Sequence, residues 1–428
     1  MIINLKKIDA LIVVALVVIA SFVLYNAGYI DTDPNPEPPV KPIVVEEENE
    51  TESEPIPPES LDSQLGYIRA VTPEDEGKHF DKLRISREQW YYTVIFDDDS
   101  ELAGWTATIS FNHMAWGDLL GTLKPDLMVV TLHGPNGKEY GGVINKKRGL
   151  GIFEKPTLEA DAPGVSVTYD NSWAEGMAPN WHVHIEDDDI DEDHDIKMDL
   201  DFFAPSDPYW TYSEKIFQKS ESNLASYVFL GCNVTGEVTV DGDTYLVKGI
   251  GHHEHTWTPN IVTKGMIKEW DWCQITLENG WNIYYSNYKI RHTLLDTKET
   301  QFNPFGAFII TTNQGKTLTV LDDIEVTVKK SDSFDDKIFL FVKMPSSIHI
   351  SAKPSGLQVL TKSYNIEVEL NIKPENTYEK VWKLPTYVGM KIGRSIIDGK
   401  ITWTDNEGVP QEVELNGLGS MWNMRALI

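Results

Sequence analysis

The chain has 428 residues, 66 of them acidic and 37 basic, and a formal net charge of -29 at pH 7. This length exceeds what one ordinary hydrophobic core accommodates, so we expect two globular domains. The acidic balance argues against a surface for nucleic acid or anionic lipid, because both need clusters of basic residues.

The N-terminal segment contains one long apolar run, ALIVVALVVIASFVLY at residues 10–25. Its length approaches the roughly 20 apolar residues that span a bilayer. Lys6 and Lys7 precede the run and no basic residue follows until Lys41, which predicts a cytoplasmic N-terminus with the remainder outside. The alternative is a cleaved signal peptide, but LYNAGYI lacks a small-x-small cleavage site. We therefore expect residues 1–30 to be a single-pass anchor in the cell membrane.

Residues 31–65 differ in composition from the rest of the chain. They are rich in proline, carry eleven acidic residues against one lysine, and contain few large apolar side chains. Such a segment cannot build a core. We expect a disordered, self-repelling linker that holds the globular part outside the membrane.

From residue 66 onward, short runs of alternating apolar and polar residues are separated by Gly, Asn and Asp. Examples are WYYTVIF before DDDS, GWTATISF, DLMVVTLHG, VSVTYDNSW and IKMDLDFF. A period of two with hairpin punctuation is typical of antiparallel β-structure. We predict an all-β fold with an N-terminal domain at residues 66–290 and a C-terminal domain at 291–428, although no internal repeat is visible.

Two further segments leave alternatives open. The acidic run EDDDIDEDHD at residues 186–195 lacks the turn glycine and distal glutamate of an EF-hand calcium loop, so we expect a solvated hairpin tip. Cys232 and Cys273 are too few for a disulfide framework or a structural zinc site. If they pair, the closed loop would stabilise the fold by roughly 4 kcal/mol. Two buried free thiols are the other interpretation.

The stretch VKGIGHHEHTWTPN at residues 247–260 carries three histidines, a glutamate and a tryptophan within six positions. Residues two apart in a strand share a face. His253, His255 and Trp257 therefore point one way and Glu254 points the other. Imidazoles on an inner face can donate, accept or titrate near neutral pH. A hydrogen-bonded wall and an acid-base or ligand-orienting site both stay open.

The next predicted strand, EWDWCQITL, alternates in the same way. Glu269, Asp271 and Cys273 share one face, and Trp270 and Trp272 share the other. Such aromatic residues most often pack across strands, and their density here also suits an aromatic-lined cavity. A zinc site would need at least one ligand beyond the histidines. Asp271 could supply it only if its strand pairs with the histidine strand in the right register, so we predict no metal.

Four segments fall in a recognisable order. They are REQWYYTVIF, with a Glu-x-Trp-Tyr strand; GIGHHEHTW, with Gly-x-Gly-x-x-Glu-His-x-Trp; EWDWCQITLENGWNIYY, with Trp-x-Trp and a turn; and IIDGKITWTDNEGVPQEVELNGLGSMWNM, which contains a Gly-x-Gly near its end. Over about residues 75–425 this set resembles the lipocalin-like family of the carotenoid 1,2-hydratases (hydroxyneurosporene synthases) and the AttH proteins.

The resemblance implies two consecutive lipocalin-like (calycin) antiparallel barrels, with a ligand site in the first or between the two. In the hydratase branch it implies addition of water to an isoprenoid double bond without a redox cofactor. By position, His255 and Trp257 match the family's His-x-Trp. Tyr285 and Asn287 fall where the hydratase branch has Tyr-x-Asp, so Asn287 is a departure.

Hydration of an unactivated alkene needs an acid that protonates carbon yet holds its proton at the working pH. A carboxyl group buried in an apolar interior meets this need because burial raises its pKa. Aromatic faces such as Trp257 or Tyr285 would stabilise the cation, and His255 would act as base. With Asn287 in the carboxyl position, the candidate acids are Glu254 and Asp271.

Two functions from different classes follow. A membrane-anchored binding protein that carries an isoprenoid or lipid-like molecule is slightly favoured by the missing carboxylate, and a cofactor-free hydro-lyase of the carotenoid 1,2-hydratase type is favoured by the histidines. A carbohydrate-active protein would need paired carboxylates at glycosidase separation. We expect no cofactor and no nucleic-acid partner. The candidate catalytic residues are His255, Trp257, Tyr285, Asp271 and Glu254, and the candidate ligand-binding residues are His253, Trp270, Trp272, Asn287 and Trp90.

Overall fold

The computed structural model describes most of the chain beyond residue 69, in ranges separated by short gaps. These are residues 55, 57, 70–80, 85–114, 126–145, 158–205, 207–213, 225–259, 267–290, 300–302, 308–312, 317–321, 323–330, 344–354, 365–382, 388–405 and 407–426. All of them belong to the unit Glu54–Ile428. Among these residues no helix is long and apolar enough to cross a membrane. The predicted anchor at residues 1–30 and nearly all of the predicted linker lie outside them.

The described chain is almost entirely β-structure, as the alternating pattern predicts. In β9 (Ile196–Phe203) buried and exposed side chains alternate strictly. The one α-helix within the described ranges is α3 (Pro73–Glu76), a single turn. Thr72 caps it, because its side chain accepts the N–H of Asp75 while the Asp75 carboxylate accepts the N–H of Thr72. A 3-10 turn, η1 (Pro135–Gly137), precedes β4.

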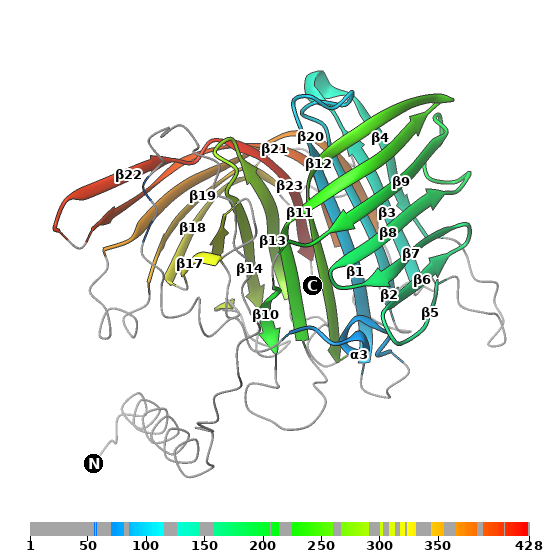
Figure 1. The fold of residues 1–428 in the computed structure, drawn as a ribbon, viewed down its shortest axis with the longest axis horizontal. Helices are drawn as coiled ribbons and strands as arrows, with labels where there is room; N and C mark the ends of the chain where they lie inside the picture. The colour runs from blue at the N-terminus through cyan, green and yellow to red at the C-terminus, as the bar shows by residue number, and fades with distance from the viewer. Residues whose placement is uncertain are drawn as a thin grey trace, which may run out of the picture. The chain divides into compact units, whose positions relative to one another are not determined.

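Two antiparallel sheets contain these strands (Figure 1). The first sheet consists of β1 (Ile85–Phe96), β2 (Thr106–Met114), β3 (Asp126–His133), β4 (Glu139–Ile144), β5 (Leu158–Ala160), β6 (Val165–Tyr169), β7 (Ser172–Met177), β8 (Asn180–Glu186), β9, β10 (Tyr209–Ser213), β11 (Ala225–Val240) and β12 (Asp243–Pro259). The second consists of β13 (Ile267–Leu277), β14 (Asn282–Ile290), β15 (Thr300–Phe302), β16 (Phe308–Thr311), β17 (Thr317–Leu321), β18 (Asp323–Lys330), β19 (Pro345–Lys353), β20 (Glu367–Trp382), β21 (Val388–Thr404), β22 (Pro410–Glu414) and β23 (Gly417–Ala426).

Both sheets follow one topology, although the sequence shows no repeat. The first has the order β4-β3-β2-β1-β12-β11-β9-β8-β7-β6-β5, and the second has β17-β16-β14-β13-β23-β21-β20-β19-β18. In each, hairpins run outward from the first strand, and the chain then returns to the opposite edge and works back. The last strand finally pairs with the first, β12 with β1 and β23 with β13.

The Gly-x-Gly motifs occupy equivalent places in the two sheets. Gly249 lies opposite Phe96, and Gly417 lies opposite Leu277. A side chain on Gly249 would collide with the carbonyl oxygen of Ile95, and one on Gly417 with that of Thr276. The glycines therefore let the last strand of each sheet approach the first closely.

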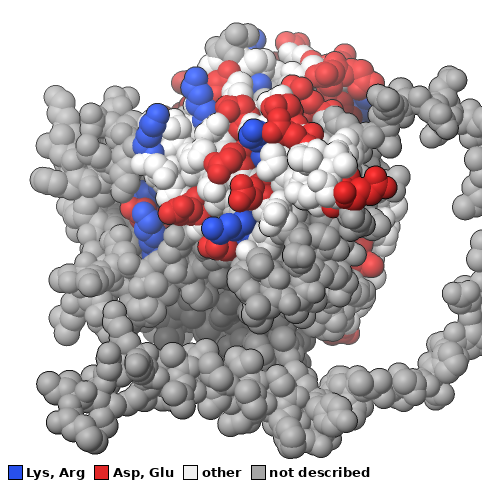
Figure 2. Space-filling view, turned by 90° about the vertical axis from the view of Figure 1, so that its left-hand side faces the viewer, with Lys and Arg blue, Asp and Glu red and all other residues white. Residues whose placement is uncertain are grey.

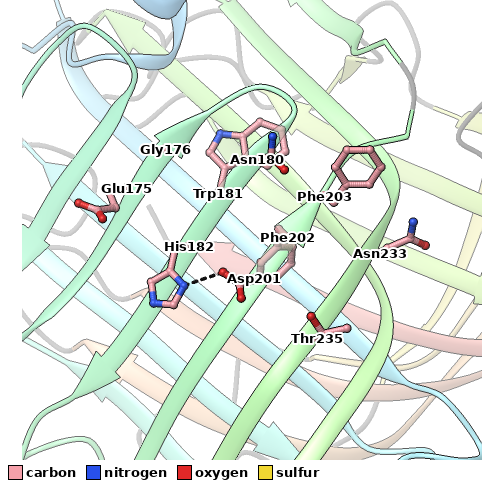
Figure 3. A pocket seen from close by; sticks show the side chains of 10 residues that line it. All are labelled: Glu175, Gly176, Asn180, Trp181, His182, Asp201, Phe202, Phe203, Asn233 and Thr235. Carbon is pink, nitrogen blue, oxygen red and sulfur yellow. Dashed lines mark hydrogen bonds and ion pairs between the residues drawn. The ribbon is translucent and has the colours of Figure 1, made fainter.

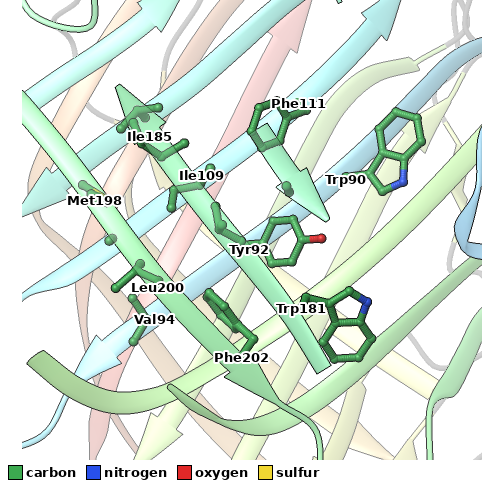
Figure 4. Packing of buried hydrophobic residues seen from close by; sticks show 14 of the residues in the cluster. Trp90, Tyr92, Val94, Ile109, Phe111, Trp181, Ile185, Met198, Leu200 and Phe202 are labelled. Carbon is green, nitrogen blue, oxygen red and sulfur yellow. The ribbon is translucent and has the colours of Figure 1, made fainter. Parts of the chain in front are cut away.

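Three groups of buried side chains hold this arrangement. The inner face of the first sheet packs aromatic and aliphatic residues such as Tyr92 and Trp181 (Figure 4). The inner face of the second sheet has its own cluster, which includes Tyr285. A third cluster joins the backs of the two sheets and includes Trp272 and Trp422. The two sheets therefore form one continuous packed unit with two separate interiors.

The structure differs from the sequence predictions in two respects. Each sheet is curled (Figure 1), and within the described residues no pairing joins the two ends of its strand order, β4 and β5 in the first sheet and β17 and β18 in the second, whereas lipocalin-like barrels were expected. The segment between β4 and β5 lies largely outside those residues. The chain enters the second sheet between Pro259 and Ile267, whereas the predicted boundary followed residue 290. β13 shares the aromatic alternation of β12, but its partners are β14 and β23.

The acidic run forms the connection between β8 and β9, as expected. It is only partly solvated, because Asp187 and Ile190 are buried. A carboxylate oxygen of Asp191 also accepts the N–H of Gly141 in β4 at 2.6 Å. The loop therefore packs against the far edge of the same sheet.

Cys232 and Cys273 are both free and buried. Cys232 lies in β11 of the first sheet and Cys273 in β13 of the second. Burial raises the pKa of each thiol to about 12. Of the two interpretations left open by the sequence, the structure shows two buried thiols.

Candidate functional site

The histidine strand β12 lies between β1 and β11, which brings its inner face against aromatic side chains. His255 is opposite Trp90 in β1 and Tyr227 in β11. Strand alternation directs His253, His255 and Trp257 into the interior of the first sheet, where all three are buried. The shared face predicted for these three residues is present, and Trp90 belongs to the same interior.

Two residues from outside the histidine strand meet His255 there. Oε1 of Glu88, in β1, lies 3.0 Å from Nε2 of His255 and 2.8 Å from Nδ1 of His79. The Glu88 carboxylate also accepts the backbone N–H groups of His79 at 2.8 Å and Phe80 at 2.9 Å. On its other side, His255 donates from Nδ1 to the carbonyl oxygen of Asp75 at 2.9 Å. Glu88 and both imidazoles are thus held in one buried cluster.

The hydrogen bonds determine how this cluster is protonated. A carbonyl oxygen only accepts, so Nδ1 of His255 carries a proton, and a second proton lies between its Nε2 and Glu88. Burial disfavours the Glu88 carboxylate, but hydrogen bonds from His255 and His79 outweigh this and hold its pKa at about 2. Burial also lowers the pKa of His255, which pulls the proton the other way. We place the proton on His255, because the backbone donors stabilise the Glu88 carboxylate.

Aromatic rings fix the orientation of both imidazoles. The His79 ring stacks on Trp257 with centroids 3.9 Å apart, and the His255 ring stacks on Trp90 at 4.7 Å. The hydroxyl of Tyr227 lies 3.4 Å from Nδ1 of His255. Side chains locked in this way hold catalytic or binding groups in a defined geometry.

A second carboxyl group enters the same interior from α3. Glu76 accepts the indole N–H of Trp181 at 2.8 Å and the backbone N–H of Ala178 at 3.0 Å. Burial raises its pKa from 4.5 to about 7, although both hydrogen bonds oppose the rise. A large fraction of Glu76 is therefore protonated at neutral pH, as a general acid requires.

Tyr92 and His253 lie beside Trp181 in this interior. The ring of His253 stacks on Tyr92 at 4.4 Å and is 4.6 Å from that of Trp181. Among the described residues, Oη of Tyr92 and Nε2 of His253 are buried without a hydrogen-bond partner. Figure 4 shows the Tyr92 hydroxyl on the same side as the indole nitrogens of Trp90 and Trp181. Buried polar atoms are normally paired, so these two are candidates for ligand binding.

Glu254, a candidate catalytic acid, points away from this interior, as the alternation predicts. It is nevertheless buried, because the second sheet covers it. Its carboxylate accepts Nε1 of Trp272 at 2.9 Å and the hydroxyls of Tyr284 at 3.2 Å and Ser226 at 2.9 Å. Burial raises its pKa despite these donors. Trp270 and Trp272 belong to the same cluster between the sheets and do not line the His255 site.

The remaining candidates, Asp271, Tyr285 and Asn287, lie on the inner face of the second sheet. Asp271 is opposite Asn287 in β14. It accepts a hydrogen bond from Asn423 at 2.7 Å and forms an ion pair with Arg425 at 2.8 Å. The structure does not bring these residues to His255, because β13 and β14 are strands of the second sheet.

A hollow formed by described residues lies away from this site. It has a volume of about 410 Å³ and lies over β7, β8, β9 and β11 (Figure 3). Most of its lining consists of solvent-facing side chains such as His182 and Asp201, which are 2.8 Å apart. We attach no chemistry to it, because the buried cluster lies on the other face of these strands.

Sequence reasoning missed three of the residues that surround His255. Glu88 was detectable, since it lies two residues before Trp90 and so shares its face. Glu76 and His79 come from the irregular segment PEDEGKHF, where no periodicity marks an inner face. The capping box at Thr72 and Asp75 is the one local pattern there.

Comparisons with known proteins give matches in structure alone. No model of a protein family matches the sequence, and no curated protein matches it. CghA, solved with Sch210972, matches with a TM-score of 0.54 and 11% identity over 87% of this chain and 95% of its own. Kievitone hydratase from Nectria haematococca matches with 0.50 and 12%, over 88% and 97%. A protein from Nitrosomonas europaea assigned to AttH matches with 0.49 and 15%, over 83% and 97%.

At such identities a likeness concerns the fold. Two of the matches, CghA and kievitone hydratase, extend over almost the whole of the neighbouring chain and include both sheets of this one. The order of the four sequence motifs indicates the same group of proteins independently. The chain therefore shares the fold of CghA and kievitone hydratase, and its motifs resemble the hydratase and AttH family.

Proposed function

We propose that the protein is an acid-base enzyme of the hydratase type, which adds water to a carbon-carbon double bond of a hydrophobic, isoprenoid-like molecule. The observation that carries the proposal is Glu76, a carboxyl group with a pKa of about 7 in the aromatic interior that also contains His255. A structural neighbour, kievitone hydratase, is a hydratase by name.

The position of Asn287 changes the balance between enzyme and carrier. A carrier is favoured on sequence because Asn287 stands where a catalytic carboxylate is expected. Asn287 lies in the second sheet, however, whereas Glu76 and Glu88 supply carboxyl groups to the His255 interior. The asparagine at position 287 therefore leaves the His255 interior with its carboxyl groups.

In the proposed reaction the protonated Glu76 donates its proton to one alkene carbon and becomes a carboxylate. The cation left on the other carbon is stabilised by the faces of Tyr92, Trp181 and Trp90. A water molecule adds its oxygen to that carbon, while His255, held between Asp75 and Glu88, forms part of the wall of the site. The proton that this water loses returns to Glu76, so the product contains one added water and the enzyme is restored.

The site of action follows from the same proposal. Residues 10–25 would anchor the protein in the cell membrane with the two sheets on the outer side, and the substrate would be drawn from the lipid phase. On the face shown in Figure 2, basic side chains stand among acidic ones over the described part. Among the described residues on this face, no cluster of basic side chains offers a surface to nucleic acid.

The test uses the full-length protein incubated with membrane lipid extract in ¹⁸O-labelled water. Mass spectrometry of bound and released lipids should find a product that is heavier by one labelled water. Glu76→Gln should abolish this product. The exposed Glu74 of the same helix provides the matched control, and Glu74→Gln should retain activity. Retention of an unchanged lipid by all three proteins would make the protein a carrier.

A further inference from the structure

We propose that His79, Glu88 and His255 form a binding site for a divalent transition-metal ion of the zinc class. They offer two imidazole nitrogens and one carboxylate oxygen. Three ligands of this kind with a fourth position for water are typical of catalytic zinc sites. Metal binding itself does not depend on the proposed function. Only the role given below to the bound water rests on that function.

The three ligand atoms already converge. Nδ1 of His79, Oε1 of Glu88 and Nε2 of His255 all lie within 4.8 Å of one another. The two nitrogens are 2.8 Å and 3.0 Å from Oε1. In a tetrahedral zinc site with bonds of about 2.1 Å, ligand atoms are roughly 3.4 Å apart. A shift of about half an ångström would therefore admit the ion.

The surroundings of these ligands match those of metal-binding residues. His255 donates its other ring N–H to the carbonyl oxygen of Asp75, the kind of contact that orients a metal-ligating histidine. Oε2 of Glu88 accepts the backbone N–H groups of His79 and Phe80, and Oε1 faces both imidazoles while it also accepts the N–H of His79 at 3.0 Å. Stacking on Trp257 and Trp90 holds both rings.

The second sheet provides an internal contrast, because its topology repeats that of the first. The register makes Asn423 the counterpart of His255 and Asp271 the counterpart of Trp90. There the buried carboxylate of Asp271 is neutralised by the guanidinium of Arg425 at 2.8 Å. In the first sheet, the side chains that contact the Glu88 carboxylate within the described ranges are the imidazoles of His79 and His255. Its positive partner is therefore an exchangeable one, a proton or a metal ion.

Metal binding would exchange the ion for one proton. The proton between His255 and Glu88 would leave, and His79 would move its ring proton from Nδ1 to Nε2, so that both ligand nitrogens present a lone pair. The fourth position of the ion would then be open to a water molecule. Under the proposed function this is the water that adds to the substrate.

The first experiment measures metal in the full-length protein, purified without a metal-affinity column. After incubation with Zn²⁺ and removal of excess, elemental analysis should find one zinc per chain. Co²⁺ should give the visible absorption of a tetrahedral site, and X-ray absorption of the zinc protein should show two imidazole nitrogens. This last measurement requires no variant, so it decides even if substitutions in the core prevent folding.

Variants then locate the site. His79→Ala, Glu88→Gln and His255→Ala should each lose the bound metal while circular dichroism shows a folded chain. His253→Ala is the matched buried control and His182→Ala the exposed control, since His182 contacts two carboxylates on the surface. Both should keep one zinc per chain.

Three results would overturn the metal proposal. They are less than a stoichiometric amount of metal in the wild type, retention of metal by the three ligand variants, and loss of metal from His182→Ala. The proposed function has a separate outcome. A protein that takes up no metal but still hydrates lipid would refute the metal site and leave the proposed function intact. A protein that binds metal but leaves lipid unchanged would refute the proposed function and leave the metal site intact.

Discussion

The indole N–H of Trp272 donates a hydrogen bond of 2.9 Å to the carboxylate of Glu254 across the boundary between the two sheets. Tyr284 donates from the second sheet as well, and Ser226 from the first. Glu254 is thus the acceptor on which donors from both sheets converge. Its role in the fold is to join them.

Removal of this acceptor should destabilise the protein. Glu254→Ala leaves buried donors on Trp272, Tyr284 and Ser226 without a partner, and we expect a loss of about 3 kcal/mol in the free energy of unfolding. Urea denaturation measures it. Glu278→Ala, at an exposed turn, should change stability by less than about 0.5 kcal/mol. Equal effects of the two substitutions would refute the role of Glu254.

The stability contributed by Glu76 should depend on pH. Its folded pKa of about 7 lies above the ordinary value of 4.5, so the folded state binds the proton more tightly than the unfolded state. This stabilisation is complete below about pH 4.5 and is lost as the pH rises through 7. Its full size is about 3 kcal/mol.

The measurement compares the wild type with Glu76→Gln, whose side chain does not titrate. The difference in their free energies of unfolding should fall by up to about 3 kcal/mol between roughly pH 4 and pH 8. Glu74→Gln is again the control, and its difference from the wild type should stay constant. A pH-independent difference for Glu76→Gln would show that the Glu76 carboxyl group titrates normally.

The Gly-x-Gly motif should tolerate no side chain at its first position. In Gly249→Ala the new methyl group would collide with the carbonyl oxygen of Ile95, and the strands would have to separate. We expect a loss of about 2 to 3 kcal/mol. Thermal unfolding measures this loss. Leu246→Ala, on the same strand but 63% exposed, should have little effect in that assay. A neutral Gly249→Ala would mean that β1 and β12 can move apart freely.

Both thiols should be protected in the folded protein. Cys232 and Cys273 are buried, and their raised pKa values of about 12 leave little reactive thiolate. A chromogenic thiol reagent should react with them slowly in buffer and with two thiols per chain in denaturant without reductant. Detection of thiols in denaturant only after reduction would reveal a disulfide.

Local alternation predicted the β-structure and the inner face of β12 because a period of two depends only on neighbouring residues. It could not assign β13 to a sheet, since the partner strand β23 lies more than a hundred residues along the chain. Asp271 and His255 therefore looked like neighbours on sequence and lie in different interiors. For the same reason the sequence did not predict that Glu254 is buried, because the sheet that covers it comes from strands that the alternation could not place.

The candidate site was predictable only in part, for a related reason. His255, Trp257 and Trp90 carry their face assignment in the sequence pattern. Glu76 and His79 reach the site because α3 and the turn after it fold over the end of the first sheet, which is a tertiary event. Residues on irregular segments acquire a role only when the scaffold positions them.

The repeated topology also affects how the chain is made. In both sheets the strand that pairs with the first is synthesised last, so β1 must wait for β12, and β13 for β23. Until residues 417–426 leave the ribosome, β13 has one long, tryptophan-rich edge without its partner. Unpaired edges of this kind recruit other chains. Slow synthesis, or a chain truncated before β23, should therefore produce aggregates rather than a smaller folded protein.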